Sequence, residues 1–358
     1  MLESPGRDRD APGASPRSPD SSPEDERPAP QANRRRLLAV VNPVAGPVGS
    51  QRSARDLKDK AERLGVELDL VETRPDLDGE AAVATTDKPY DVYIAMGGDG
   101  TVKEVARAAM KNDVPLAIIP RGTANAVAWH FRLPFDVGQA LQVILKGKPV
   151  AIDIARSGER DFLIMAGLGY DAAVMRDATR VLKRRFGFLA YLYSALKNLG
   201  RKPNTFLVHL DDQPTVRVRG ASAVIANIGT LAGNIRVVRK VDPHDGYLDL
   251  VILSPQRFSD FARLVYRGIR GRLEDDPRVR YFRAAKIRVE CRPSAPLEID
   301  GDGIEGRHRS FEAEAVPQAL TLLVPAEGQV RFLWKPDVSW GNGMSFAKGR
   351  VGKRAKPD

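Results

Sequence analysis

Apolar and polar positions in the first half of the chain follow two periods in turn. Residues 36–41 form a continuous apolar run closed by Asn42-Pro43 and Gly46, which is typical of a buried parallel strand that ends in a turn. Residues 53–64 place apolar side chains three and four positions apart with charges between them, which predicts a helix. The same patterns predict further strands at 66–71, 91–96 and 115–119, and further helices at 78–85 and 102–110. This regular alternation predicts a doubly wound parallel α/β sheet.

The pattern changes after a last helical run at 141–145. The second half consists of short apolar or alternating runs separated by Gly, Pro and Asp, which predicts a mostly β, sandwich-like domain. Two helical stretches interrupt these runs, one after Met175 and one at 259–272. The predicted strands are 149–155, 162–166, 205–210, 215–218, 221–226, 247–253, 286–291, 297–299, 310–315 and 319–324.

Composition indicates a folded body between two tails. The chain has 358 residues, of which 42% are hydrophobic and 28% charged, as is ordinary for a globular protein. Residues 1–35 are dense in Pro, Ser and Asp and are predicted to be a disordered leader, and 331–358 are predicted to be a basic flexible tail. We therefore expect an α/β nucleotide-binding domain over 36–150 and a mostly β substrate domain over 151–330.

The sequence shows no sign of export or of a membrane span. The N-terminus has no apolar core of signal-peptide length, and no stretch approaches the roughly 18 uninterrupted apolar residues of a spanning helix. A single cysteine, Cys291, excludes an intramolecular disulfide and a Cys-rich zinc site, and the four histidines lie far apart. We expect a cytoplasmic protein in a reducing compartment.

The net charge of +10 favours anionic partners such as phosphates, nucleic acid or an anionic bilayer. Residues 176–202 concentrate this charge, with eight basic residues and one acidic residue, and carry aromatic and leucine side chains at 186–196. That composition suits peripheral attachment to an anionic membrane surface. An ordinary basic helix pair that packs its aromatics inward is the alternative. No helix-turn-helix, RRM or zinc-finger pattern is present, so no nucleic-acid partner is expected.

Candidate chemistry gathers at the turns that follow the predicted parallel strands. Gly97-Gly98-Asp99-Gly100-Thr101 lies between a strand and a helix, so backbone N–H groups and a helix N-terminus converge there, which suits phosphate. Asp99 beside a polyphosphate would hold Mg²⁺ directly or through water. A tight turn with Asp as helix cap is the alternative interpretation.

Two further polar turns follow neighbouring strands. Asn42 to Gly46 ends the first strand, and Pro120 to Asn125 ends the strand at 115–119. Asn42, Thr123 and Thr73 can offer hydrogen bonds to ribose or phosphate, although each alone would be an ordinary turn or cap residue. Because ligands of open α/β sheets bind outside the carboxyl ends of the strands, the three turns together predict a nucleotide site.

Six ordered motifs extend this pattern over most of the folded body. With them the chain resembles the diacylglycerol kinase catalytic-domain superfamily, in its bacterial lipid kinase branch, which also contains sphingosine and ceramide kinases. The similarity runs from about residue 36 to 325. The motifs are Asn42-Pro-Val-Ala-Gly46, Gly97-Gly-Asp-Gly-Thr101 with Glu104, Pro120-Arg-Gly-Thr-Ala-Asn125, Gly167-Leu-Gly-Tyr-Asp171-Ala, Asp245-Gly-Tyr-Leu-Asp249 and Ile299-Asp300-Gly301-Asp302.

The resemblance implies a nucleotide site and two roles for Mg²⁺. A catalytic Mg²⁺ would be held near Asp99, and a structural Mg²⁺ in the second domain by Asp242, Asp245 and Tyr247, with backbone carbonyls from the first and last. ATP would be contacted by Asn42, Thr73, Gly97, Gly98, Asp99, Gly100, Thr101, Val102, Lys103, Glu104, Thr123 and Asn125.

The chain departs from the family pattern at three positions. The proton acceptor is usually a Glu, and here Asp302 takes that position, with an arm shorter by one methylene. Either the backbone compensates, or Asp300 carries more of the work. Lys103 replaces a common Asn and could add charge to the phosphate site, but we expect it to face solvent. Ala126 follows Asn125 where Asp is common.

These features together favour an ATP-dependent lipid kinase that phosphorylates a lipid hydroxyl, of diacylglycerol or a related membrane lipid. Asp302, with Asp300, would take the proton across an interdomain cleft, while Asp99 holds Mg²⁺ at the phosphates. An NAD kinase and a non-catalytic nucleotide-binding or membrane-binding scaffold are the alternatives. The expected partner is a lipid substrate at an anionic membrane surface, and a homodimer is left open.

Overall fold

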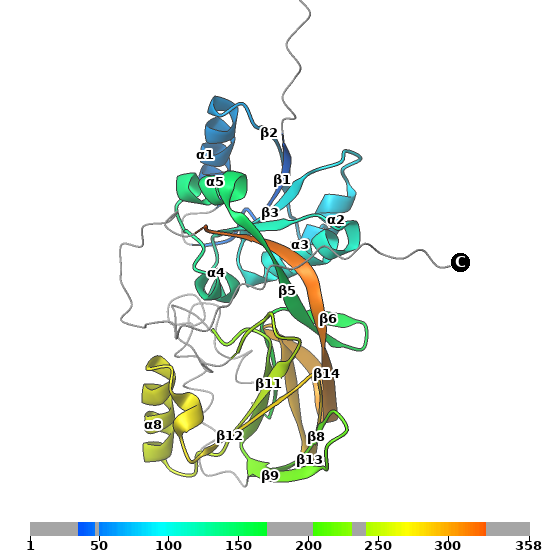
Figure 1. The fold of residues 1–358 in the computed structure, drawn as a ribbon, viewed down its shortest axis with the longest axis vertical. Helices are drawn as coiled ribbons and strands as arrows, with labels where there is room; N and C mark the ends of the chain where they lie inside the picture. Colours follow the sequence, from blue (N-terminus) through cyan, green and yellow to red (C-terminus); the bar gives the residue numbers. More distant parts are fainter. Residues whose placement is uncertain (1–34, 47–49, 170–202, 231–240, 327–358) are drawn as a thin grey trace, which may run out of the picture. The chain divides into compact units, whose positions relative to one another are not determined.

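The computed structural model describes residues 35–46, 50–169, 203–230 and 241–326, and the strands in these ranges join into one continuous sheet (Figure 1). Its N-terminal part is parallel, in the order β2-β1-β3-β4. The strands are β1 (Arg36–Val41), β2 (Glu67–Glu72), β3 (Val92–Gly97) and β4 (Leu116–Pro120). The helices between and after them are α1 (Ser50–Arg63), α2 (Gly79–Ala84), α3 (Asp99–Asn112), α4 (Ala126–His130) and α5 (Val137–Lys146).

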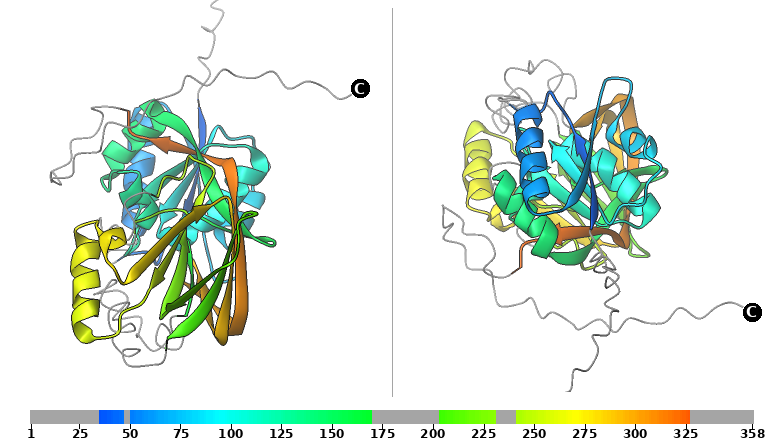
Figure 2. Two further views of the ribbon diagram at one scale, coloured as in Figure 1. Left: turned by 60° about the horizontal axis from the view of Figure 1, so that its bottom comes forward. Right: turned by 90° about the horizontal axis from the view of Figure 1, so that it is seen from above.

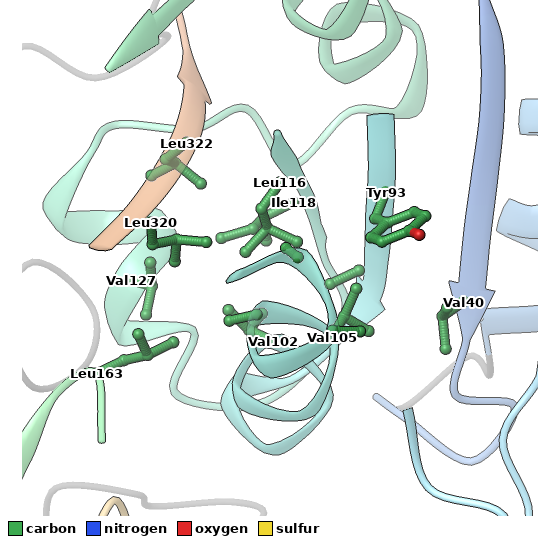
Figure 3. Close-up of a cluster of buried hydrophobic side chains, with 14 of the residues drawn as sticks. Val40, Tyr93, Val102, Val105, Leu116, Ile118, Val127, Leu163, Leu320 and Leu322 are labelled. Atoms are coloured by element: carbon green, nitrogen blue, oxygen red, sulfur yellow. The ribbon is translucent and has the colours of Figure 1, made fainter. Parts of the chain in front are cut away.

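Helices cover both faces of this parallel sheet. Alternate residues of β1 divide between two clusters: Leu37, Ala39 and Val41 pack with α1 and α5, whereas Leu38 and Val40 pack with α2, α3 and α4. Figure 2 (right) shows α1, in blue, and the cyan helices α2 and α3 on opposite sides of the strands. Figure 3 shows the second cluster, in which side chains of α3 and α4 meet those of β4 and β14. The predicted doubly wound α/β fold is confirmed.

The second half is mostly antiparallel β structure, as predicted, with its own apolar cluster built from its strands. One helix, α8 (Phe258–Ile269), and a 3₁₀ turn, η1 (Leu273–Asp275), lie between β11 and β12 in the sequence. The strands are β5 (Lys148–Ser157), β6 (Arg160–Phe162), β7 (Met165–Leu168), β8 (Asn204–Leu210), β9 (Val216–Gly220), β10 (Ser222–Ala226), β11 (Leu248–Leu253), β12 (Val279–Ala284), β13 (Lys286–Ile299) and β14 (Asp302–Val324).

The long strand β14 connects the two halves. It pairs antiparallel with β13 and β5, and near its end it runs parallel to β4, where Leu322 faces Leu116. The boundary predicted at residue 150 falls inside β5, whose residues 148–156 pair with β14. The predicted leader and tail lie outside the described residues. In the part of the chain that is described, no helix is both long and apolar enough to span a membrane.

Several element boundaries differ from the sequence-based expectation. The helix expected from Val102 begins at Asp99, because the Val102 N–H already donates to Gly98 O. The run at 162–166 is divided between β6 and β7, since Leu163 and Ile164 donate their N–H groups to a carboxylate instead of a neighbouring strand. The four predicted segments at the end of the chain merge into β13 and β14, whose register shifts hide their continuity in the sequence.

Candidate active site

The glycine turn joins β3 to α3 and packs tightly against Thr101 in the first turn of the helix. Gly98 is the N-cap of α3 and, lacking a side chain, leaves the helix without a side-chain cap. A Cβ on Gly97 would lie 2.4 Å from Thr101 Oγ1, so only glycine fits there. The first N–H groups of a helix have no partner within the helix and lie at the positive end of its dipole. The turn therefore presents backbone donors suited to an anion.

The three turns predicted to form one site are in direct contact. A Cβ on Gly122 would lie 2.4 Å from Gly98 Cα, so the second and third turns meet backbone against backbone. Arg121 N donates to Gly97 O at 2.8 Å. The first turn joins them at Gly46, whose φ is +76° and where a Cβ would lie 2.3 Å from Arg121 O. Glycine is thus required at each crossing.

Asn42 connects the first turn to the glycine turn through its side chain. Its Nδ2 donates to Thr101 Oγ1 at 3.2 Å, and its Oδ1 accepts from Val44 N at 3.2 Å. Thr101 is 3% exposed, so this bond lies inside the junction of the turns. Asn42 therefore orders the site, and only its remaining hydrogen-bonding capacity is left for a ligand.

The other predicted polar contacts separate into two kinds. Thr123 is exposed, at the tip of the third turn, and can reach a ligand. Asn125 is buried, with a left-handed φ of 47°, and both of its amide atoms bond Gly122 at 2.8 and 2.9 Å. Thr73 is 8% exposed, and its N–H donates to Val41 O. Asn125 therefore shapes the third turn, and both polar atoms of its side chain already have a partner within that turn.

Two predicted nucleotide contacts on α3 make contacts within the domain. The Val102 side chain is 2% exposed in the core beneath α3 (Figure 3), and its N–H is used within the helix. The Glu104 carboxylate accepts from Gly79 N at 2.9 Å and so caps α2. As placed, these two residues join α3 to the core and to α2.

Asp99 is the carboxylate at the centre of the site. Its Oδ1 lies 3.4 Å from Val127 N, at the start of α4, and its side chain is partly exposed. Its pKa is raised to about 6, mainly by burial and also by the nearby Asp300 carboxylate, against backbone donors that lower it. Mg²⁺ in phosphoryl-transfer sites is held by one or two carboxylates together with the substrate phosphates. The Asp99 carboxylate, partly exposed beside the phosphate-binding turn, fits that ion.

The Asp300 carboxylate is held by three backbone N–H groups. Its two carboxylate oxygens accept from Leu163 N, Ile164 N and Met165 N at 2.9, 2.9 and 3.0 Å. Burial raises its pKa, against these three donors that lower it. The residue has a left-handed φ of 48°, which places the following Gly301 in the turn between β13 and β14. Three of the acceptor positions of the Asp300 carboxylate are therefore used by backbone N–H groups.

Asp302 lies open and reaches α3 from the second half of the chain. Its carboxylate is paired with Lys103 Nζ, and its side chain is 69% exposed. The Lys103 side chain is only 15% exposed, so the expectation that it faces solvent is wrong. The reason is that β14 supplies a carboxylate from 199 residues away along the chain. Lys103 follows Asp99 by four residues, so the two lie on the same face of α3, and Asp302 contacts that face at Lys103, one helical turn beyond Asp99.

A groove of about 870 Å³ begins at the Lys103–Asp302 pair. It follows α3 past Arg107 and Lys111 and is bounded on the other side by the β5–β6 hairpin. Eleven of its fourteen lining residues are charged, so it suits a polar group and not an acyl chain. The basic residues of α3 in it are four positions apart, a spacing visible in the sequence that was not used to predict the site.

Asp245, the implied side-chain ligand of the structural Mg²⁺, already contacts a cation in this structure. Asp245 Oδ2 is 2.9 Å from Arg283 Nη1, and Oδ1 accepts from Tyr247 N at 3.1 Å. Asp242 accepts from His244 Nδ1 at 2.7 Å, and this bond holds the pKa of Asp242 below its usual value, whereas burial raises the pKa of Asp245. A guanidinium already supplies positive charge beside Asp245. Among the described residues, no three His, Cys, Asp or Glu side chains gather to bind a metal.

Asp153 is a further anchor that the sequence patterns did not single out. It is fully buried on β5, and its carboxylate accepts from Gly246 N at 2.7 Å and Gln318 N at 2.8 Å. It thus ties the turn that contains Asp245 to β14. The rest of the Gly167 motif, from Tyr170, and the basic stretch at 176–202 lie outside the described residues.

Two known families match consecutive segments of the chain. The family described as "Diacylglycerol kinase catalytic domain" matches residues 36–157, and the family described as "YegS C-terminal NAD kinase beta sandwich-like domain" matches residues 165–324. The first covers all three turns of the site, and the second covers Asp300 and Asp302. The candidate site therefore draws residues from both matched segments.

Individual proteins agree with the family matches. An uncharacterized protein of Synechocystis sp. is 28% identical over 312 residues, which cover 80% of this chain and 70% of that protein. A diacylglycerol kinase of Staphylococcus saprophyticus is 29% identical over 276 residues, which cover 75% of this chain and 89% of that protein. A crystal structure from Bacillus anthracis str. Sterne, provisionally named a diacylglycerol kinase, superposes with a TM-score of 0.70 at 20% identity, over 83% of this chain and 98% of that one. At that identity the superposition shows a common fold.

Proposed function

The chain belongs to the diacylglycerol kinase catalytic domain family, with a YegS-like C-terminal domain, and from this premise we propose that it is an ATP-dependent lipid kinase. Its acceptor would be the hydroxyl of diacylglycerol or of a related membrane lipid, taken from an anionic membrane surface on the cytoplasmic side. One observation carries the proposal: Asp302, from β14, contacts α3 at Lys103, one helical turn from Asp99 at the start of the same helix.

The glycine turn would bind the phosphates of ATP through its backbone. The N–H groups at the start of α3 are fixed in direction because the turn is packed against Gly122 and Asn42 holds Thr101. Fixed donors stabilise charge that develops during phosphoryl transfer without a reorganisation cost at that moment. Thr123, exposed at the tip of the neighbouring turn, is placed to add a side-chain donor.

Asp99 would hold the catalytic cation. When bound there, Mg²⁺ would neutralise charge on the transferring phosphate. The raised pKa of about 6 supports this role, because a carboxylate that is costly to ionise gains most from a nearby cation. Asp300 contributes by its negative charge and by holding the turn that carries Asp302.

Asp302 would accept the proton of the lipid hydroxyl. Its exposure leaves the carboxylate open to a substrate, and Lys103 fixes its position against α3. The approach of β14 to the helix would compensate for the short aspartate arm. The charged groove beyond this pair suits the polar part of the acceptor, so the acyl chains must lie elsewhere, toward apolar surface.

The full-length protein should be assayed with radiolabelled ATP against a panel of diacylglycerol, monoacylglycerol, ceramide and sphingosine, with NAD in a parallel reaction. Phosphate transfer to one of the lipids, lost in Asp99→Asn, is the expected result. Asp113→Asn is the matched control, because Asp113 is exposed at the far end of the same helix with a left-handed φ of 54° that asparagine accepts.

The other outcomes of the same assay would refute the proposal. Transfer to NAD and to no lipid would make the protein an NAD kinase. Binding of ATP with no transfer to any acceptor would leave a nucleotide-binding scaffold, in which Asp302 cannot replace the longer acid found in relatives.

A further inference from the structure

Helix α8 exposes a row of side chains that its packing does not require. Phe258, Ala262, Tyr266 and Arg270 follow one another at intervals of four, so they line one side of the helix, and all four are exposed. Phe258 is 65% exposed and Tyr266 59%, which makes them two of the most exposed large apolar side chains in the described part of the chain. The Arg270 guanidinium lies 5.4 Å from the centre of the Tyr266 ring.

The other side of α8 attaches the helix to the domain. Leu264 is 5% exposed and packs with Val251 of β11, Leu273 of η1 and Val279 of β12. Figure 1 shows α8, in yellow, beside the ends of β11 and β12, at one edge of the β half. The outward row therefore lies on the side of α8 opposite Leu264.

Acidic side chains around α8 are directed inward and neutralised. Asp276 is 2% exposed, with Arg263 Nε at 2.7 Å and Arg267 Nε at 3.3 Å. Asp260 is 5% exposed and accepts from the N–H groups of Gln256 and Arg257. Burial of the acids leaves the outward surface without negative charge.

The exposed residues between 256 and 272 include none that is acidic, and the next exposed acid along the chain is Asp275, in η1. The set combines aromatic rings with arginines and small polar groups. It comprises Gln256, Arg257, Phe258, Ser259, Ala262, Tyr266, Arg270 and Arg272. We call this set the α8 face.

We propose that the α8 face docks the protein on an anionic phospholipid bilayer. Aromatic side chains enter the headgroup region of a bilayer, while arginines attract anionic lipids and extend their charged ends to the phosphates. The charge is complementary only to an anionic surface, and the apolar row distinguishes a bilayer from nucleic acid. The proposal goes beyond the kinase assignment, because docking needs no phosphoryl transfer, and it would hold the active site near a lipid substrate.

Vesicle cosedimentation of the full-length protein tests the proposal, with vesicles of phosphatidylcholine alone and of an equal mixture with phosphatidylglycerol. The parent protein should bind the mixed vesicles far better. Phe258→Ser with Tyr266→Ser should weaken this binding about tenfold or more, because two aromatic side chains leave the interface. Arg270→Gln should weaken it about fivefold. Leu64→Ser and Arg55→Gln, exposed positions at α1, are the matched controls and should bind like the parent.

Two further measurements keep the result independent of variant folding and of catalysis. Hydrogen exchange of the parent protein should slow at 256–272 when mixed vesicles are added. Turnover of a short-chain soluble lipid should be unchanged in the α8 variants, so a kinase assay that fails for every lipid refutes the proposed function and leaves docking intact. Equal vesicle binding by the parent and the aromatic variant would overturn the docking proposal. So would light scattering that shows a dimer of the parent and a monomer of the variant, because the α8 face would then bind another copy of the chain.

Discussion

Replacing Asp99 by asparagine should have two effects: it should stabilise the fold, and it should greatly slow turnover. The carboxylate is the group on which the proposed cation depends, so the variant should lose about 10² to 10³ in kcat. Ionisation of this carboxylate also lowers the stability of the folded protein, since burial raises its pKa from 3.8 to about 6. Asparagine keeps the Oδ1 acceptor for Val127 N without the charge.

The gain in stability can be worked out from the pKa. Each pKa step corresponds to about 1.4 kcal/mol, so the shift of Asp99 would lower the free energy of unfolding at pH 7 by about 3 kcal/mol if the carboxylate were fully shielded. Because the side chain is partly exposed, we expect about 2 kcal/mol. The asparagine variant should therefore unfold a few degrees above the parent at pH 7.

The pH dependence gives the sign of the effect. A carboxyl whose pKa is raised in the folded state binds its proton more tightly there, so folding is penalised only when the proton is lost. The penalty is absent below pH 3.8, grows between pH 3.8 and about 6, and is complete above that. The difference in unfolding temperature between variant and parent should shrink accordingly as the pH falls from 7 to 4.

Thermal unfolding by circular dichroism from pH 4 to 8, with and without Mg²⁺, measures these quantities. Mg²⁺ should raise the unfolding temperature of the parent and not that of the variant. Asp113→Asn should match the parent in stability and turnover at every pH. A variant that is less stable than the parent at all pH values, or that keeps near-normal turnover, would contradict the assignment of Asp99.

Three other changes address the remaining parts of the site. Asp302→Asn should lose about 10² to 10⁴ in kcat with little change in unfolding temperature, and Asp302→Glu should keep or raise activity; a mild Asn variant would exclude Asp302 as the base. Asp300→Asn should lower the unfolding temperature, because an amide offers one acceptor oxygen to three backbone donors, and an unchanged temperature would contradict the positioning role. Gly122→Ala should destabilise the protein by about 1 to 3 kcal/mol and raise KM for ATP, because its Cβ meets Gly98 Cα at 2.4 Å. Gly100→Ala, with nothing within 4 Å, should not lower the unfolding temperature, and equal losses in the two alanine variants would refute the contact argument.

The sequence by itself determined the fold class and the position of the turns. Residues 37–41 and 92–96 are apolar at every position because both faces of the sheet are covered, and this property can be seen within each run alone. Parallel strands end at the same edge of a sheet, so three polar turns had to be neighbours. The glycines of these turns were visible because only they allow the backbones to cross.

Only the tertiary structure decided what each polar side chain does at that edge. Asn125 and Thr123 look equivalent in the sequence, yet one is turned inward onto Gly122 and the other is exposed. Asp300 and Asp302 are two residues apart, yet the first is held by the N–H groups of Leu163 to Met165 and the second is open. Lys103 faces Asp302 because a distant strand passes over α3.

The physical reason is that hydrophobic patterns and polar contacts depend on residues at different distances along the chain. Hydrophobic periodicity reports which face of an element is buried, and that information repeats within a few residues. The partner of a carboxylate or an amide depends on which backbone donors other elements bring within about 3 Å, and those elements are more than a hundred residues away in the case of Asp300. A one-dimensional pattern therefore locates the site, whereas the long-range packing of β14 on β4 and α3 assigns its residues their separate roles.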